Sequence, residues 1–141
     1  MKKVGLLAIA HGSKSREHVE VVFQIANRLL SSLSEYDIVA HEVAFMGSRK
    51  GLKSIHEALK ELSTKCEEIV VLPLFLTPGK HVSSDIPREM GLPNCSPASK
   101  HKIQVEGRHI TLIYANPIGF DERVVEILRD RFKEAYNMLI K

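Results

Sequence analysis

The most hydrophobic stretch of the sequence is residues 69–76 (IVVLPLFL), and residues 77–81 (TPGKH) follow it directly. A continuous apolar run of this length that is rich in β-branched residues is typical of a strand buried on both faces of a parallel sheet. We therefore predict that residues 69–76 form the central strand. Pro73 interrupts the run. Because proline has no N–H to donate, we expect a bulge or one-sided pairing at that position.

Strand-like and helix-like segments alternate on both sides of this run. Three more apolar segments read as strands, at residues 4–10, 38–45 and 110–115. Helical spacing of apolar residues indicates helices between or after the strands; these residues are Val22, Ile25, Ala26, Leu29 and Leu33, then Leu52, Ile55, Leu59 and Leu62, and finally Val124, Leu128, Phe132, Ala135 and Leu139. The alternation predicts an α/β fold with an open, mainly parallel, four-stranded sheet and helices on both faces. We expect a flavodoxin-like order, with the first strand between the second and third.

The whole chain, residues 1–141, reads as a single domain. A short helix is expected near residues 87–90, and residues 116–119 are predicted to form a turn. Residues 91–108 show little periodicity and contain two prolines and two glycines. A long connection of this kind is predicted to be a flexible flap.

Composition excludes several classes of protein. The chain has 141 residues, a net charge of +3, no tryptophan and 6% aromatic residues, which argues against a nucleic-acid-binding stripe or a base-stacking platform. No apolar run approaches the roughly 20 residues of a membrane span. Residues 4–10 are followed by His11-Gly12-Ser13 without a cleavage site, so we expect no signal peptide. Two isolated cysteines, Cys66 and Cys95, favour a reducing cytoplasm.

Two histidines are predicted to share one crevice. In an open parallel sheet, ligands bind beyond the carboxyl ends of the strands, where the strand order reverses. His11 directly follows the first strand, and His81 follows the third by five residues. Adjacent Gly12 and nearby Gly79 would allow a positive φ and close approach of a ligand. The alternative interpretation is that both histidines are ordinary polar loop residues.

Positive charge gathers around the same predicted crevice. Seven basic residues lie in or near the loops after the first three strands: Lys14, Arg16, Arg49, Lys50, Lys53, Lys80 and Arg88. Together they suggest a ligand with several negative charges, although each alone is typical of a solvated surface. Ser13 opens a helix whose N–H groups favour an anion, or serves only as its N-cap. His41 and Glu42 point to opposite strand faces, and either remains a candidate third ligand.

Several motifs, in order along almost the whole chain, carry a family resemblance. They are AHGS at 10–13, AFM at 44–46 with Arg49-Lys50 after it, VLPLFLTPGKH at 71–81, DIP at 85–87 and NPIG at 116–119. The sequence resembles the short class II chelatases. It looks like the small archaeal sirohydrochlorin cobaltochelatases, which are similar to the sirohydrochlorin nickelchelatases of coenzyme F430 synthesis.

The resemblance implies insertion of Co²⁺ into sirohydrochlorin without ATP, in anaerobic cobalamin biosynthesis and without a prosthetic group. It makes His11 the proton acceptor and a metal ligand, and His81 a second metal ligand. It also implies a homodimer, which agrees with a short chain that supplies one wall of a cleft. The predicted substrate contacts are Ser13, Arg49, Lys50, Leu76, Thr77, Pro78, Gly79 and Lys80.

Alternatives remain at this point. Many relatives carry an acidic residue after the AF motif, whereas this chain has Gly47-Ser48-Arg49-Lys50, so cobalt, nickel and iron are not distinguished. A histidine phosphatase would need an arginine where Ala10 stands, and no G-x-S-x-G motif supports an α/β-hydrolase. A non-catalytic carrier of metal or tetrapyrrole would keep both histidines.

Overall fold

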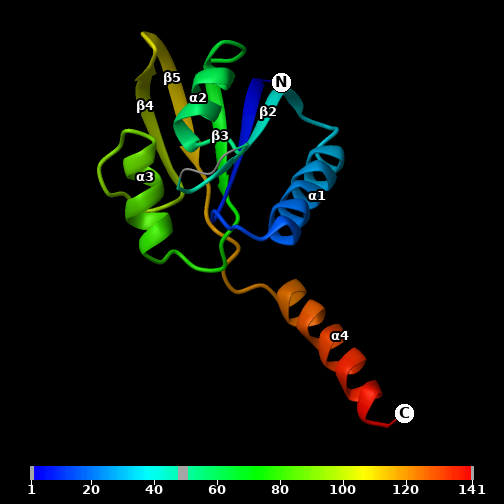
Figure 1. The fold of residues 1–141 in the computed structure, drawn as a ribbon. Coiled ribbons are helices and arrows are strands. Elements are labelled where there is room, and N and C mark those ends of the chain that lie inside the picture. The colour runs from blue at the N-terminus through cyan, green and yellow to red at the C-terminus, as the bar shows by residue number, and fades with distance from the viewer. Residues whose placement is uncertain (1, 48–50, 141) are drawn as a thin grey trace.

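The structure is a computed structural model that describes residues 2–47 and 51–140. It contains a mixed sheet with helices on both faces (Figure 1). In chain order the elements are β1 (Lys3–Ala10), α1 (Arg16–Ser32), β2 (Asp37–Phe45), α2 (Ile55–Ser63), β3 (Glu68–Pro73), η1 (His81–Asp85), α3 (Ile86–Glu89), β4 (Ser99–Val105), β5 (Arg108–Tyr114) and α4 (Glu122–Leu139).

The sheet has five strands in the order β2-β1-β3-β5-β4. β1 pairs in parallel with β2 and β3, and β3 pairs in parallel with β5. The predicted α/β class is confirmed, together with the position of the first strand between the second and third. β3 lies in the middle of the sheet, as its hydrophobicity predicted.

Pro73 is the last residue of β3, so the strand is shorter than the predicted residues 69–76. Pro73 pairs with Ile9 of β1, whereas the pairing of β3 with β5 ends two residues earlier, at Val71. The expected one-sided pairing is therefore confirmed. It leaves the chain free to turn away from the sheet toward residues 77–81.

The prediction of four strands is wrong because residues 99–105 of the expected flap form β4. β4 pairs antiparallel with β5 through a tight turn at Glu106 and Gly107, both of which have positive φ. Two-residue turns of this kind match the twist of a hairpin. The segment before the hairpin is hydrogen-bonded to the segment after β3, since the Cys95 N–H donates to the Ser83 carbonyl at 3.1 Å. Residues 99–105 of the expected flap are therefore part of the sheet edge.

The main core lies between the sheet and the layer formed by α2, η1 and α3. Alternate residues of β3, β5 and β1 are fully buried there, including Leu7, Ile69 and Leu112. α2 begins with a capping box: Ser54 accepts from the Glu57 N–H, and the Glu57 side chain accepts from the Ser54 N–H. The buried face of α2 consists of Ile55, Ala58, Leu59, Leu62 and Ser63.

The opposite face of the sheet is only partly covered. α1 packs there against a small cluster around Val22, Ala10 and Phe45. Val70, Leu72 and Ile113 alternate with buried residues along β3 and β5, and they are only half-buried. A strip of this face over β3 and β5 therefore has incomplete apolar cover within the described residues.

α4 leaves the domain and projects away from the sheet (Figure 1). None of its residues is buried. Its departure point is fixed because the Ile118 N–H donates to the Phe75 carbonyl at 2.8 Å and the Gly119 N–H donates to the Leu76 carbonyl at 2.6 Å. Asp121 caps the helix by accepting from the Arg123 N–H at 2.9 Å. No helix within residues 2–47 and 51–140 is long and apolar enough to cross a membrane.

Candidate functional site

His11 and His81 lie next to each other at the carboxyl ends of β1 and β3. Their ring centroids are 5.3 Å apart, and the ring planes are inclined by 58°. Both side chains are exposed to solvent. Because β1 and β3 are adjacent and parallel, their carboxyl ends meet at one edge, and this topology brings together residues that are 70 positions apart in sequence. The predicted juxtaposition is therefore present.

His81 begins a π-helical turn, η1, that runs directly into α3. The Ile86 N–H donates to the His81 carbonyl, which is the five-residue spacing of a π-helix. Such turns are frequent at functional sites. The Phe75 ring lies 5.9 Å from the His81 ring, so an aromatic side chain from the loop after β3 borders the pair.

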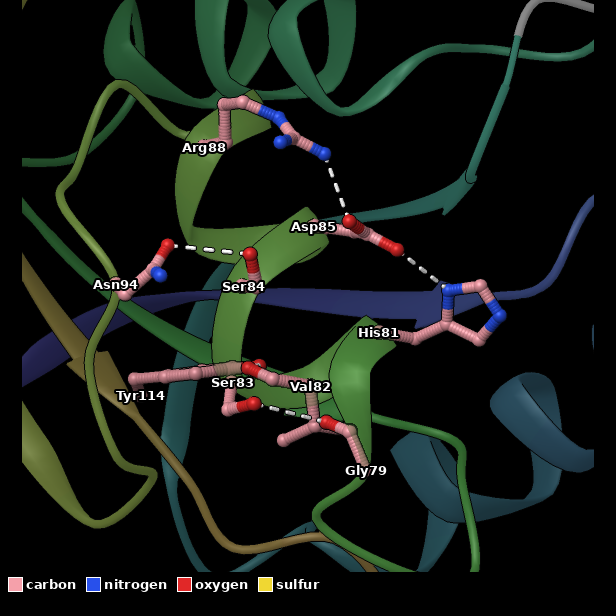
Figure 2. Close-up of polar contacts among 9 residues, drawn as sticks. All are labelled: Gly79, His81, Val82, Ser83, Ser84, Asp85, Arg88, Asn94 and Tyr114. Atoms are coloured by element: carbon pink, nitrogen blue, oxygen red, sulfur yellow. Dashed lines mark hydrogen bonds and ion pairs between the residues drawn. The ribbon is translucent and has the colours of Figure 1, made fainter.

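Asp85 holds the His81 ring from one side. The His81 Nδ1 and the Asp85 Oδ2 are 2.8 Å apart, and the Arg88 guanidinium donates to the Asp85 Oδ1 at 2.7 Å (Figure 2). Hydrogen bonding from His81 holds the pKa of the Asp85 carboxyl below its usual value, and the charges of Lys80 and Arg88 act in the same direction. Asp85 is therefore an ionised acceptor at neutral pH.

The backbone around His11 is held by the start of α1. His18 Nε2 donates to the His11 carbonyl at 2.9 Å. The N-cap of α1 is Ser15, which accepts from the His18 N–H, while the Ser13 hydroxyl accepts from the Ser15 N–H at 3.0 Å. Ser13 therefore shapes the turn before the helix rather than capping it.

The loop after β3 carries most of the predicted substrate contacts, and its residues Leu76, Thr77, Pro78, Gly79 and Lys80 are all exposed. The Gly79 carbonyl accepts from the Val82 N–H at 3.1 Å and from the Ser83 N–H and hydroxyl at 3.0 Å each. Glycine permits a positive φ, but neither Gly12 nor Gly79 adopts one in the structure. A Cβ added to Gly79 would meet only the Thr77 hydroxyl, at 3.8 Å.

Other predicted residues lie elsewhere. Glu42 forms an ion pair with Lys53, which raises the pKa of the Lys53 ammonium. His41 stands four residues before the end of β2, about 13 Å along the strand from the carboxyl edge. Neither is presented at that edge as a free third ligand. Arg49 and Lys50 lie outside the described residues.

Two imidazoles are the potential metal ligands that the structure brings together. Across residues 2–47 and 51–140, no cluster of three or more histidine, cysteine, aspartate or glutamate side chains is arranged to hold a metal ion. Neutral imidazole is a good ligand for first-row divalent metals. A pair of exposed imidazoles provides a partial coordination sphere, which leaves the remaining positions open to solvent or to another ligand.

Sequence reasoning missed the role of three residues at this site. Asp85 appeared only as part of the DIP motif, and Arg88 only as a basic loop residue. The four-residue spacing from His81 to Asp85 was a usable signal, since residues at this spacing face each other on a helix. Nothing local predicted Tyr114, whose buried hydroxyl donates to the Val82 carbonyl at 2.5 Å.

Known proteins resemble this chain over nearly its full length. The sequence profile of the CbiX family matches residues 5–135. A sirohydrochlorin cobaltochelatase of Saccharolobus solfataricus is 37% identical over 135 residues, covering 95% of this chain and 97% of that protein. A sirohydrochlorin cobaltochelatase of Methanosarcina barkeri is 34% identical, covering 95% of this chain and 98% of that protein.

Solved structures share the fold. The sirohydrochlorin chelatase SirB from Bacillus subtilis subspecies spizizenii, in complex with cobalt, matches with a TM-score of 0.66 and 23% identity. That match covers 95% of this chain but 51% of SirB. A putative cobalamin biosynthesis CbiX protein from Marinobacter aquaeolei matches with a TM-score of 0.59 and 21% identity, covering 98% of both chains. The profile match and the full-length relatives together show that this chain belongs to the CbiX family.

Proposed function

We propose that this chain is a sirohydrochlorin cobaltochelatase, which inserts Co²⁺ into sirohydrochlorin without ATP in cobalamin biosynthesis. The observation that carries this proposal is the pair of exposed imidazoles, His11 and His81, with ring centroids 5.3 Å apart at the carboxyl edge of the sheet. The names of the two archaeal relatives support the choice of reaction, and the cobalt complex of SirB supports the choice of metal.

Metal insertion needs a ligand that presents the ion and a base that removes the pyrrole protons. Imidazole serves for both, because it binds Co²⁺ as a neutral ligand and titrates near neutral pH. We assign the base to His11 and metal binding to both histidines. A site with two protein ligands suits a metal that must leave, since the nitrogen atoms of the macrocycle can take over the other positions.

The tetrapyrrole is proposed to lie against the loop 76–80, with Ser13 beside it. The exposed Leu76 offers an apolar contact for the macrocycle, and the ammonium of the exposed Lys80 offers a charge for its peripheral carboxylates. Arg49 and Lys50 remain predicted substrate contacts outside the described residues. A location in the cytoplasm likewise remains a prediction.

A homodimer is the proposed working unit, and α4 supports it. The apolar residues of α4 repeat at helical spacing and are exposed: Val125 45%, Leu128 63%, Phe132 67%, Tyr136 50% and Leu139 80%. A solvated helix with such a stripe is stabilised by packing against another surface. We propose that a second copy supplies that surface, because the strip of sheet over β3 and β5 also has incomplete apolar cover.

The test is insertion of Co²⁺ into sirohydrochlorin, followed by absorbance and compared with the uncatalysed rate at the same metal concentration. Loss of the base in His11→Ala lowers the catalysed rate by about 10²–10⁴-fold, and His81→Ala also removes most of it. His109→Ala is the matched control, because His109 lies at the start of β5, at the other end of the sheet. Undiminished rates in both site variants would show that the histidine pair is not the catalytic centre.

Two alternatives are decided by the same assay. A nickelchelatase for coenzyme F430 would insert Ni²⁺ faster than Co²⁺ when the two ions compete, and an iron chelatase would favour Fe²⁺. Imidazole ligands alone do not select among these ions. A non-catalytic carrier would bind metal or tetrapyrrole through His11 and His81 without raising the insertion rate above the background.

A further inference from the structure

His81 has one ring nitrogen committed to a partner on its own helical segment. Its Nδ1 lies 2.8 Å from the Asp85 Oδ2, and Figure 2 shows the other ring nitrogen on the side of the ring away from Asp85. We propose that Asp85 and Arg88 are positioning residues for His81: the carboxylate fixes the imidazole proton on Nδ1 and leaves Nε2 as the metal-binding atom. This inference rests on the proposed role of His81 as a metal ligand.

The chemistry of the two groups sets the direction of the hydrogen bond. An ionised carboxylate only accepts hydrogen bonds, so a neutral imidazole beside it must place its proton on the facing nitrogen. The lone pair is then on Nε2. A metal ligand of this kind also gains basicity from the carboxylate behind it, and its ring orientation is fixed.

Arg88 fixes the carboxylate in turn. Its guanidinium donates to the second oxygen, Asp85 Oδ1, at 2.7 Å, so the two carboxylate oxygens serve different partners. The Asp85 side chain is 14% exposed, whereas those of His81 and Arg88 are 48% and 69% exposed. The Asp85 carboxylate is therefore the least exposed group of the network, and the side chains of His81 and Arg88 contact it from the solvent-exposed surface.

The backbone that carries this network is held from outside the helical turn. Pro87 has no N–H, so the Ser83 carbonyl lacks its usual donor within the helix. The Cys95 N–H donates to it instead, at 3.1 Å. The buried Tyr114 hydroxyl donates to the Val82 carbonyl at 2.5 Å, and Ser84 is hydrogen-bonded to Asn94 at 3.1 Å (Figure 2). These contacts fix η1, so that the geometry between His81 and Asp85 is set before any ligand arrives.

The experiment has two readouts on the full-length protein without tetrapyrrole. Long-range ¹H–¹⁵N NMR of the histidine rings, at a pH where His81 is neutral, reports which nitrogen carries the proton. We expect Nδ1 in the wild type and a shift toward Nε2 in Asp85→Ala. Titration with Co²⁺ alone, followed by its visible absorption, is expected to show about 10–100-fold weaker binding in the same variant.

Two further variants keep the test decisive. Asp85→Asn preserves the shape of the side chain but removes its charge. It is expected to change both readouts in the same direction as Asp85→Ala, and it replaces that variant if Asp85→Ala folds poorly. Asp121→Ala is the matched control, since Asp121 is also bound by an arginine, Arg123, at 2.7 Å. It is expected to leave both readouts unchanged.

An unchanged His81 tautomer in both Asp85 variants would overturn the proposal. A changed tautomer with unaltered Co²⁺ affinity would overturn it as well, because the position of the His81 ring proton would then have no effect on metal binding. Failure of the proposed function has a different signature: the wild type and His81→Ala would bind Co²⁺ equally, whatever the NMR of Asp85 variants shows.

Discussion

The exposed stripe on α4 gives a quantitative prediction for Phe132→Ala. Phe132 is 67% exposed in the single chain, so a partner can cover about two thirds of it. Complete burial of a phenylalanine side chain contributes about 1.5–3 kcal/mol of free energy, so burial of two thirds of it contributes about 1–2 kcal/mol to association. In a dimer with two-fold symmetry each copy contributes the same residue. The substitution therefore weakens association by about 2–4 kcal/mol, a Kd increase of about 30-fold to 700-fold.

The assay is sedimentation equilibrium of the full-length chain over a wide range of concentrations. Alanine favours the helix more than phenylalanine does, so unfolding of α4 would not account for the loss. Tyr36→Ala is the matched control, because Tyr36 is an aromatic residue with a similar exposure of 56% that lies just before β2. A wild-type chain that stays monomeric, or a Phe132→Ala chain with the wild-type Kd, would refute the assignment of α4 to the dimer.

Three further predictions concern stability, each measured by urea denaturation. Tyr114→Phe leaves the Val82 carbonyl without its buried donor and is expected to lower the free energy of unfolding by about 1–3 kcal/mol; an unchanged value would show that η1 does not depend on this bond. Gly5→Ala places a Cβ 2.5 Å from the Cys66 Sγ, an overpacking expected to cost about 1–3 kcal/mol, and the double variant with Cys66→Ala should recover most of it if this clash is the cause. Burial raises the pKa of the Cys66 thiol above its ordinary value of 9.0. The folded state therefore favours the protonated thiol, which contributes fully to the free energy of unfolding below pH 9, and this contribution is lost as the pH rises through the folded pKa. Cys66→Ala should show a smaller loss of stability at alkaline pH. Identical pH profiles for the two proteins would contradict this reasoning.

The strands and their order were largely predictable, because each strand of the parallel part is marked by its own apolar run. β4 was missed although it has a signal. Residues 99–105 alternate in burial, with Ile103 and Val105 toward the core and Lys102 and Gln104 toward solvent. A half-buried edge strand shows this alternation rather than a continuous apolar run, and the nearby prolines at 93 and 97 obscured it.

The histidine pair was predictable for a topological reason. Adjacent parallel strands end at the same edge, so residues that follow β1 and β3 must meet there. The third ligand candidates were not resolved by sequence, since the ion pair of Glu42 with Lys53 depends on how β2 and the segment before α2 come together. Charge pairing of this kind has no local pattern.

By itself the sequence determined the α/β class, the central position of β3 and the meeting of His11 with His81, because hydrophobic periodicity and strand order are encoded in local runs of residues. Only the tertiary structure decided how His81 is held and where α4 goes. The Tyr114 bond to Val82 depends on the packing of η1 against β5, whereas the distances from Asp85 to His81 and Arg88 depend on the helical conformation of residues 81–89. The direction of α4 depends on two backbone hydrogen bonds to residues 75 and 76. Side-chain and backbone contacts between distant segments depend on geometry in three dimensions, and no residue pattern along the chain specifies that geometry.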